Sequence, residues 1–249
     1  MRKLKAKEPT RWMAIADSHG EFVDKEAEEI AYGFMDEFQP SIRVHLGDIF
    51  DFRWLRQNAS RTDCESDPEQ DIEMGCDLLR WYKPTHILRG NHDQRLYDRL
   101  PGGRYEIKSG PELAQVREYV TEISEAEGDA KVRPYEKNTG IFRIGGLRIT
   151  HGNKAGLNAI RDLTRIYGDC LVGHIHAIER VPVPRFTGGR SYAVGRCIGC
   201  LCQVDLDYNR AQTTTMRQQN GFAFGWVEPG GTTIVRQAEK TGKHWEIPW

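Results

Sequence analysis

Five short polar segments of this sequence carry residue types that bind transition-metal ions. Each contributes Asp, Asn or His, and glycine stands beside most of them. They are Asp17-Ser18-His19, Gly47-Asp48 followed by Asp51, Gly90-Asn91-His92-Asp93, His151-Gly152 and Gly173-His174-Ile175-His176. Imidazole and carboxylate groups are ligands of such ions, and glycine allows backbone and ion to approach closely. Because one carboxylate can bridge two cations, the set predicts a two-metal centre with room for water and substrate oxygens.

The remaining histidines and the cysteines are interpreted as structural. A lone histidine is more often a structural or surface residue than a ligand, and His45, His86 and His244 are interpreted in this way. The cysteines are Cys64, Cys76, Cys170, Cys197, Cys200 and Cys202. They are dispersed in a chain without an export signal, which favours reduced thiols over disulfides. The stretch 197–202 would bind zinc only with further ligands, so small buried strand residues are the favoured interpretation.

The metal-binding segments lie where predicted strands end. The strand candidates are short apolar runs at residues 12–16, 42–46, 85–88, 147–150 and 170–172. In open α/β sheets the carboxyl ends of the strands form the ligand crevice. Five strand ends are therefore expected to deliver their Asp, Asn and His side chains to one edge of the fold.

Helices are predicted between these strands. Apolar residues at helical spacing select residues 24–38, the second half of 53–82, 111–127 and 157–167. The runs 141–144 and 147–150 are joined by Gly145-Gly146, which predicts a hairpin, and residues 128–139 are predicted to form a polar connection. Strands that alternate with helices imply a parallel or mixed sheet with helices packed on it.

Composition and charge narrow the class of protein. The chain has 249 residues, of which 39% are hydrophobic and 29% charged, so an ordinary globular domain is expected. Lys and Arg number 35 against 36 Asp and Glu, which argues against indiscriminate binding of polyanions. The basic start is not followed by an apolar stretch of signal-peptide length, and no run approaches a membrane span. A cytoplasmic protein is therefore expected.

In this order the five segments resemble the signature of calcineurin-like metallophosphoesterases, from residue 17 to residue 176. The resemblance implies an α/β fold, a four-layer α/β/β/α sandwich with two central mixed sheets. It also implies one domain over residues 1–249. The segments would lie in a core of residues 11–180, while residues 181–249 would supply mainly strands of the second sheet and a C-terminal tail.

The resemblance also implies a ligand set and a reaction. One metal would be held by Asp17, His19 and His176. The other would be held by Asn91, His151 and His174, with Asp48 bridging the two. A hydroxide shared by two divalent ions would attack phosphorus in line with the leaving group. Mn²⁺ is the expected metal, although such a ligand set also accepts Fe, Zn, Co or Ni.

Two further residues take catalytic roles in this resemblance. His92 would stabilise the phosphoryl group or protonate the leaving oxygen, with Asp51 orienting its imidazole. A helix cap or a surface acid is the alternative interpretation of Asp51. Arg53 and Arg89 are the nearest candidates for binding the substrate phosphate, although both could equally be solvated charges at strand ends.

The sequence favours one substrate class over others without singling out a substrate. Phosphoprotein phosphatases carry Arg after the equivalent of Asp51 and Glu after the equivalent of His92, whereas this chain has Phe52 and Asp93. Asn-His-Asp also occurs in the nuclease and phosphodiesterase branches, so a phosphodiester, including DNA or RNA, is the preferred substrate. A phosphomonoester is the second hypothesis. A non-catalytic binding scaffold is the third, against which the complete ligand set argues.

Three other stretches are candidates for substrate contact. The segment 52–74, with Trp54, Arg56 and Arg61, leaves the site directly after Asp51 and could cover it. The stretches 89–108 and 180–196 are rich in arginine. The second also contains Phe186, Arg190 and Tyr192, and basic residues with aromatics could follow a nucleic-acid backbone. A solvated surface would explain the same residues.

Overall fold

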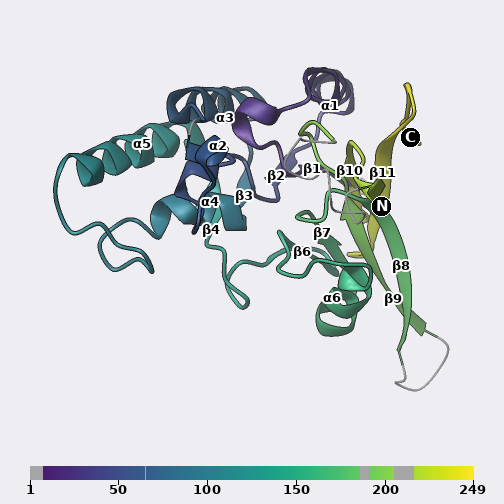
Figure 1. The fold of residues 1–249 in the computed structure, drawn as a ribbon. Coiled ribbons are helices and arrows are strands. Elements are labelled where there is room, and N and C mark those ends of the chain that lie inside the picture. Colours follow the sequence, from purple (N-terminus) through teal and green to yellow (C-terminus); the bar gives the residue numbers. More distant parts are fainter. Residues whose placement is uncertain (1–7, 65, 186–190, 205–215) are drawn as a thin grey trace, which may run out of the picture.

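Two β-sheets packed face to face form the centre of the computed structural model, which describes residues 8–249 except 65, 186–190 and 205–215 (Figure 1). The larger sheet has the strand order β12-β11-β10-β1-β2-β3-β4, and the smaller has the order β5-β6-β7-β9-β8. The larger contains β1 (Thr10–Ile15), β2 (Ile42–His45), β3 (His86–Leu88), β4 (Lys131–Arg133), β10 (Gly221–Val227), β11 (Thr233–Thr241) and β12 (His244–Glu246). The smaller contains β5 (Phe142–Ile144), β6 (Leu147–Thr150), β7 (Cys170–Val172), β8 (Ile178–Arg185) and β9 (Ser191–Ile198). Both sheets combine parallel and antiparallel pairs.

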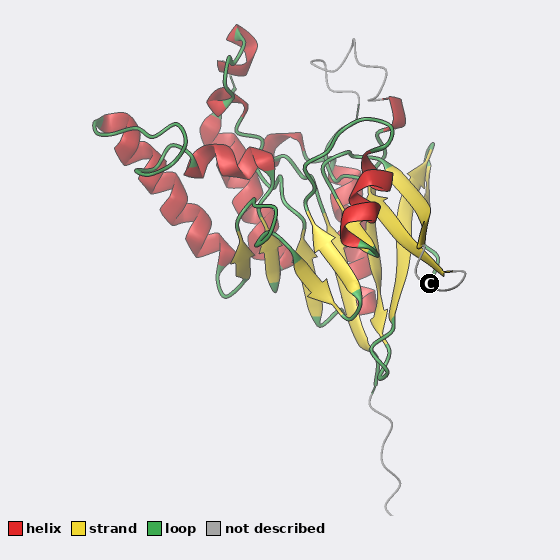
Figure 2. Ribbon diagram, turned by 90° about the horizontal axis from the view of Figure 1, so that it is seen from below, coloured by secondary structure: helices red, strands yellow, loops and turns green. Residues whose placement is uncertain are grey.

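Helices cover the outer faces of the two sheets (Figure 2). They are α1 (Lys25–Phe38), α2 (Arg61–Cys64), α3 (Pro68–Tyr82), α4 (Asn91–Tyr97), α5 (Pro111–Glu127) and α6 (Ala159–Tyr167), with 3-10 turns at Gly20–Phe22 and Arg53–Leu55. Helices α1, α3 and α5 pack on the larger sheet and α6 on the smaller. The expected four-layer α/β/β/α sandwich is confirmed. None of the described helices has the length and apolar character needed to cross a bilayer.

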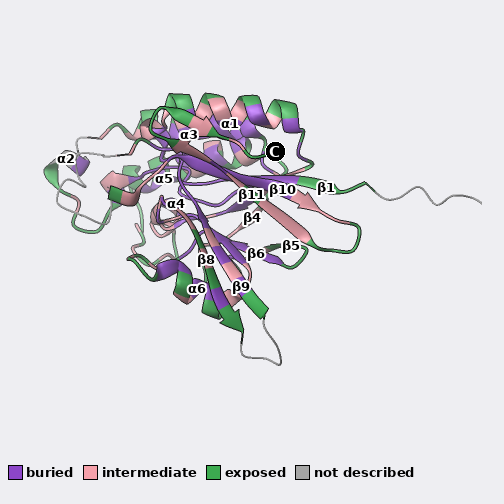
Figure 3. Ribbon diagram, turned by 90° about the vertical axis from the view of Figure 1, so that its right-hand side faces the viewer, coloured by how far each residue is buried: buried purple, intermediate pink, exposed green. Residues whose placement is uncertain are grey.

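Strand β1 shows why the layers form. Trp12 and Ala14 belong to the apolar cluster between the sheets, together with Leu171 of the smaller sheet. Met13 and Ile15 point to the opposite face and join the cluster beneath α1. Because strand side chains alternate between faces, a continuous apolar run marks a strand that is covered on both sides. Figure 3 shows this burial concentrated in the central strands, with exposed residues on the outer faces of the helices.

Most predicted elements are present, and β4 and α4 are among those that were not predicted. The predicted hairpin forms, with Ile144 opposite Leu147 in antiparallel β5 and β6. Strand β4 lies inside the predicted polar connection and pairs in parallel with β3. Its three residues are too few to display an apolar alternation. Helix α4 begins at Asn91, where the sequence lacks helical apolar spacing, and the carboxylate of Asp93 accepts a hydrogen bond from Gly90 N at its start.

Gly75 allows α3 to pack closely against the loop that follows Asp48. A Cβ at Gly75 would lie 2.3 Å from Cε1 of Phe50, which is buried and stacked on Phe52. We expect Gly75→Ala to lower the free energy of unfolding by about 1–3 kcal/mol because the ring has no space to move into. Urea unfolding of the metal-free protein measures this change.

Gly33 provides the matched control in an exposed helix position. A Cβ there meets no atom within 4 Å. Gly33→Ala should raise the free energy of unfolding by about 0.5–1 kcal/mol because alanine loses less backbone entropy than glycine on folding. Shifts of the same sign in the two variants would contradict the packing argument.

Candidate metal centre

The ends of five strands, three from the larger sheet and two from the smaller, meet at one edge. Asp17 and His19 follow β1, Asp48 follows β2, Asn91 and His92 follow β3, His151 follows β6, and His174 and His176 follow β7. Backbone hydrogen bonds tie the loops together within each sheet, from Asp17 N to Gly47 O at 3.0 Å and from Gly173 N to His151 O at 3.1 Å. The edge therefore assembles side chains from positions 17 to 176.

Five of the predicted ligands have left-handed backbone conformations. Their φ values are 54° at Asp17, 52° at His19, 51° at Asp48, 66° at His174 and 58° at His176. This region is sparsely populated by residues other than glycine, and each such residue costs roughly 1–3 kcal/mol. Backbone strain of this kind gathers at functional sites, where the surrounding structure enforces it.

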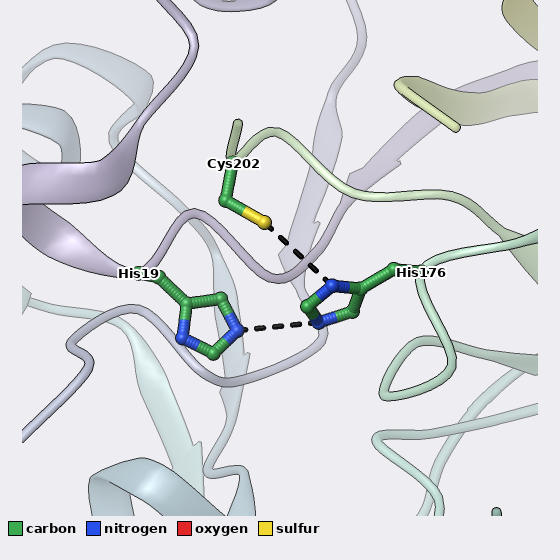
Figure 4. Close-up of side chains that lie close together, drawn as sticks. All are labelled: His19, His176 and Cys202. Carbon is green, nitrogen blue, oxygen red and sulfur yellow. Dashed lines mark hydrogen bonds between the residues drawn. The ribbon is translucent and has the colours of Figure 1, made fainter. Parts of the chain in front are cut away.

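The first ligand cluster joins Asp17, His19 and His176. The Nε2 atoms of His19 and His176 lie 3.2 Å apart (Figure 4), and His176 Nε2 is 3.5 Å from Asp17 Oδ1. Asp17 also accepts hydrogen bonds from the backbone N of His174 at 2.9 and 3.1 Å. Two imidazole nitrogens and a carboxylate oxygen thus converge on one point, as one metal ion requires.

The second cluster forms around Asp48 and His151. His151 Nε2 lies 3.2 Å from Asp48 Oδ2 and 3.1 Å from Asn91 Oδ1, and the His174 ring is 5.1 Å from that of His151, centroid to centroid. Asp48 Oδ2 also lies 4.0 Å from His19 Nε2 of the first cluster. Carboxylate oxygens of Asp48 lie within 4.8 Å of possible ligand atoms of Asp17 and His19, and likewise of His151 and His174. The two clusters therefore share one carboxylate, which is the arrangement that fits a pair of divalent cations.

In two histidines, a hydrogen bond at Nδ1 turns Nε2 toward the ligand clusters. His19 Nδ1 is 2.8 Å from Asp51 Oδ1, and His151 Nδ1 donates to the backbone oxygen of Leu46 at 2.8 Å. Burial alone would raise the pKa of Asp51, but its hydrogen bonds to His19 and His92 hold that pKa below the usual range. Asp51 is therefore ionised, and its carboxylate accepts a hydrogen bond from Nδ1–H of His19. A neutral imidazole with Nδ1–H presents the Nε2 lone pair to a metal ion.

The buried charges of the second cluster are coupled. Burial lowers the pKa of His151, yet the neighbouring Asp48 outweighs burial and raises it to about 9. Burial likewise raises the pKa of Asp48, but His151 and His92 hold it well below its usual range. Without metal a proton thus occupies the space between carboxylate and imidazole. A divalent cation would displace that proton, because metal ligands must be deprotonated.

His92 stands beside the two clusters. Its Nδ1 donates to the backbone oxygen of Asp51 at 2.8 Å and lies 3.1 Å from Asp51 Oδ1, while its backbone N donates to Asp48 Oδ1. His92 and the predicted ligands His19, Asp48, His174 and His176 line a cavity of about 270 Å³. With Nδ1 engaged, Nε2 is the nitrogen left to act on a substrate.

The two predicted phosphate-binding arginines lie in different places. Arg53 lines the cavity, where its Nε is 2.7 Å from Asp51 Oδ2. Arg89 does not line that cavity. Its guanidinium lies 3.5 Å from the centroid of the Tyr97 ring and 3.6 Å from Glu127 Oε1. It borders a second cavity, of about 250 Å³, which Tyr135 and His151 also line.

The other candidates for substrate contact lie in different places. Arg95, from the arginine-rich stretch 89–108, lines the cavity and donates to Asp51 O, one helical turn beyond Asn91 in α4. Because α4 was not predicted, the sequence alone could not place Arg95 at the site. Trp54, predicted to cover the site, packs against Tyr119 of α5 instead. Phe186 and Arg190 lie outside the described residues.

Two buried aspartates hold the loop that carries Asp48 and Asp51. The carboxylate of Asp93 accepts hydrogen bonds from the backbone N of Asp48, Ile49, Phe50 and Gly90 at 2.8–3.2 Å. The carboxylate of Asp71 accepts from the backbone N of Asp51 and Phe52. Gly90 is needed at this crossing because a Cβ there would lie 2.1 Å from Asp48 Oδ1.

The three histidines interpreted as structural or surface residues are found in the following places. His45 is buried, accepts from Gly47 N through Nδ1 and contacts the hydroxyl of Ser18. His86 stacks on Phe142, and His244 is exposed. Five of the cysteines are buried and free of disulfides in the described part of the chain. They are Cys76, Cys170, Cys197, Cys200 and Cys202.

The chain is similar to known phosphoesterases. The model of the calcineurin-like phosphoesterase family matches residues 10–177. The gene 54 proteins of Mycobacterium phages D29 and L5 are 26% and 25% identical to this chain, and each match covers 95% of this chain and 99% of the relative. The structure of a metallophosphoesterase from Sphaerobacter thermophilus has a TM-score of 0.50 and 17% identity, and the match covers 93% of this chain and 88% of that one. This structural likeness shows a shared fold.

Replacing the Asp93 carboxylate tests its hold on the Asp48 loop. In Asp93→Asn one acceptor oxygen becomes an NH₂ group that faces backbone donors, so we expect the free energy of unfolding to fall by about 1–3 kcal/mol. Urea unfolding in the presence of a chelator measures this change without any contribution from metal. Asp77→Asn, at the exposed partner of Arg80, should change stability little. Equal stabilities of the Asp93 variant and the wild type would contradict the role given to Asp93.

Proposed function

Since the chain belongs to the calcineurin-like phosphoesterase family and is a metal-dependent hydrolase, we propose that it cleaves phosphodiesters, with DNA and RNA as the preferred substrates. The observation that carries the proposal is the pair of ligand clusters that share Asp48 beside a cavity containing His92. A binding scaffold would have no need of strained ligand residues or of a histidine aimed at a substrate.

The proposed centre uses all seven residues of the ligand set. Asp17, His19 and His176 hold one cation. Asn91, His151 and His174 hold the other, and Asp48 bridges them. Divalent ions bound there, Mn²⁺ foremost, supply positive charge for the phosphate oxygens and lower the pKa of a water molecule. The inward-facing Nε2 atoms of His19 and His151 support this assignment.

His92 is the proposed acid for the leaving group. Its Nδ1–H is fixed on Asp51 O, so the ring is held with Nε2 toward the cavity. When Nε2 carries a proton, it can donate that proton to the departing alkoxide oxygen, and the nearby Asp51 carboxylate stabilises the cationic ring before transfer. Asp51 thus orients both His19 and His92.

Arginines in the cavity support a substrate that carries negative charge on both sides of the cleaved bond. Arg53, Arg56 and Arg95 line the same cavity as His92. A guanidinium can bind phosphate oxygens in a fork, and several of them suit the sugar–phosphate backbone of a nucleic acid. For the second arginine predicted from the sequence, Arg89, we propose at most a contact outside this cavity.

A phosphomonoesterase is the second candidate. The cavity, about 270 Å³, is smaller than the roughly 300–1,000 Å³ of typical small-molecule pockets, which favours a small phosphorylated group. The same cavity could hold one phosphate of a longer chain that continues across the surface.

Loss of the bridging carboxylate should abolish turnover. With Mn²⁺ and bis-nitrophenyl phosphate, we expect Asp48→Ala and His174→Ala to lose at least about 100-fold in kcat/KM, because each removes a ligand of the ions that activate water. His244→Ala, at an exposed histidine, is the control and should retain wild-type rates. Undiminished activity in either ligand variant would refute the assigned centre.

The acid role of His92 predicts a dependence on the leaving group. His92→Ala should slow cleavage of esters with alkoxide leaving groups by about 10²–10⁴-fold, and nitrophenyl esters far less, since nitrophenolate departs without a proton. Comparing kcat for methyl and nitrophenyl diesters measures the difference. If the variant kept its turnover with the poor leaving group, His92 would not be the acid.

A substrate panel tests the diester preference. We expect Mn²⁺-loaded protein to cleave single- or double-stranded DNA, or RNA, faster than it hydrolyses phosphomonoesters. Gel analysis of nucleic acids beside colorimetric assays of monoesters and cyclic nucleotides gives the comparison. Efficient monoester turnover without nucleic-acid cleavage would instead establish the second candidate.

A further inference from the structure

The residues that follow β9 pass directly behind the first ligand cluster. The backbone N of Cys202 donates to Asp17 O at 3.0 Å, and the backbone N of Leu201 donates to Ala16 O at the same distance. On the other side, Cys200 N donates to Gln219 O, whose own backbone N donates to His176 O at 2.7 Å. This short segment therefore connects the backbone of a ligand from the larger sheet with that of a ligand from the smaller sheet.

The side chain of Cys202 contacts one of these ligands. Its sulfur is buried and lies 3.7 Å from Nδ1 of His176, whereas Nε2 of the same ring faces His19 (Figure 4). The backbone oxygen of Cys202 accepts a hydrogen bond from Asn220 Nδ2 at 2.7 Å, which fixes the residue from behind. The thiol thus lies on the ring nitrogen that is turned away from the cluster.

We propose that Cys202 is a positioning residue of this metal centre, with its sulfur accepting the Nδ1–H of His176 so that the Nε2 lone pair points to the ion. The proposal rests on the ligand assignment made under Proposed function. His19 and His151 show the same arrangement, with Asp51 and the Leu46 carbonyl as their outer acceptors. Such partners fix the tautomer and orientation of a ligating imidazole.

The geometry also distinguishes positioning from direct ligation. Ligand atoms of Cys202, His19 and His176 lie within 4.8 Å of one another, so a soft metal could in principle use the sulfur. However, the sulfur contacts Nδ1, and the lone-pair directions of Nδ1 and Nε2 diverge within one imidazole ring. The sulfur therefore lies at the nitrogen of His176 that does not face His19, which favours positioning over ligation.

The test measures metal affinity of the full-length protein. Metal-free protein is titrated with Mn²⁺ in competition with a chromophoric chelator. We expect Cys202→Ala to weaken one of the two binding sites by about 10–100-fold and to leave the other unchanged. Cys202→Ser keeps an acceptor and should recover part of the affinity. Cys76→Ala, which removes an equally buried thiol from α3, should bind both ions like the wild type.

Two spectroscopic measurements do not depend on the alanine variant folding. Nitrogen-15 shifts of His176 in the wild type loaded with diamagnetic Zn²⁺ should report a protonated Nδ1 and a deprotonated Nε2, and a protonated Nε2 would overturn the proposal. The Co²⁺-loaded wild type should lack a sulfur-to-cobalt charge-transfer band in the near ultraviolet. A band that disappears in Cys202→Ser would make Cys202 a ligand and overturn the positioning role.

The affinity series separates this proposal from the one on which it rests. Wild-type affinity in Cys202→Ala, together with weakened binding in His176→Ala, would overturn the role of Cys202 alone. If His176→Ala also bound both ions like the wild type, the ligand assignment itself would fail.

Discussion

Negative charge buried at the strand ends is the constraint around which this protein is arranged. The side chains of Asp17, Asp48, Asp51, Asp71 and Asp93 are all 3% exposed or less. A buried carboxylate without partners costs several kcal/mol, so each one needs donors or cations in fixed places. Three of them meet imidazoles, and the other two accept backbone N–H groups. The shape of the loops follows from these partnerships.

The five aspartates form two groups according to the partners that they contact. Asp17, Asp48 and Asp51 contact histidines and are the aspartates proposed to bind cations or to orient the acid. Asp71 and Asp93 face inward to the backbone and have no access to a substrate. The loop 48–52 has left-handed residues at both ends, at Asp48 and Phe52. The backbone N of Asp48 donates to Asp93 and that of Phe52 to Asp71, and these hydrogen bonds explain how the loop holds this conformation.

The sequence contained enough to predict the strands and the convergence of their ends. Buried strands such as β1 and β7 are continuous apolar runs, and a polar residue that ends such a run must lie at the edge of the sheet. The contacts that support the site could not be predicted, because they join residues far apart in the sequence and no periodic pattern of residues marks them. Asp93 meets Ile49 across 44 residues, and Cys202 meets His176 through a segment that no local pattern places. Arg95 was a candidate for substrate contact, but its place at the cavity could not be predicted because α4 was not.

The distribution of the ligands along the chain also has a consequence for biosynthesis. A ribosome releases Asp17, His19, Asp48 and Asn91 well before His151, and Cys202 leaves last of all. N-terminal parts of a chain can begin to fold while synthesis continues. Until the smaller sheet exists, however, the emerging larger sheet carries a carboxylate-rich edge without His151, His174 and His176. Stable metal capture must therefore await the docking of the second sheet, which makes loading of the centre a late step in the maturation of this protein.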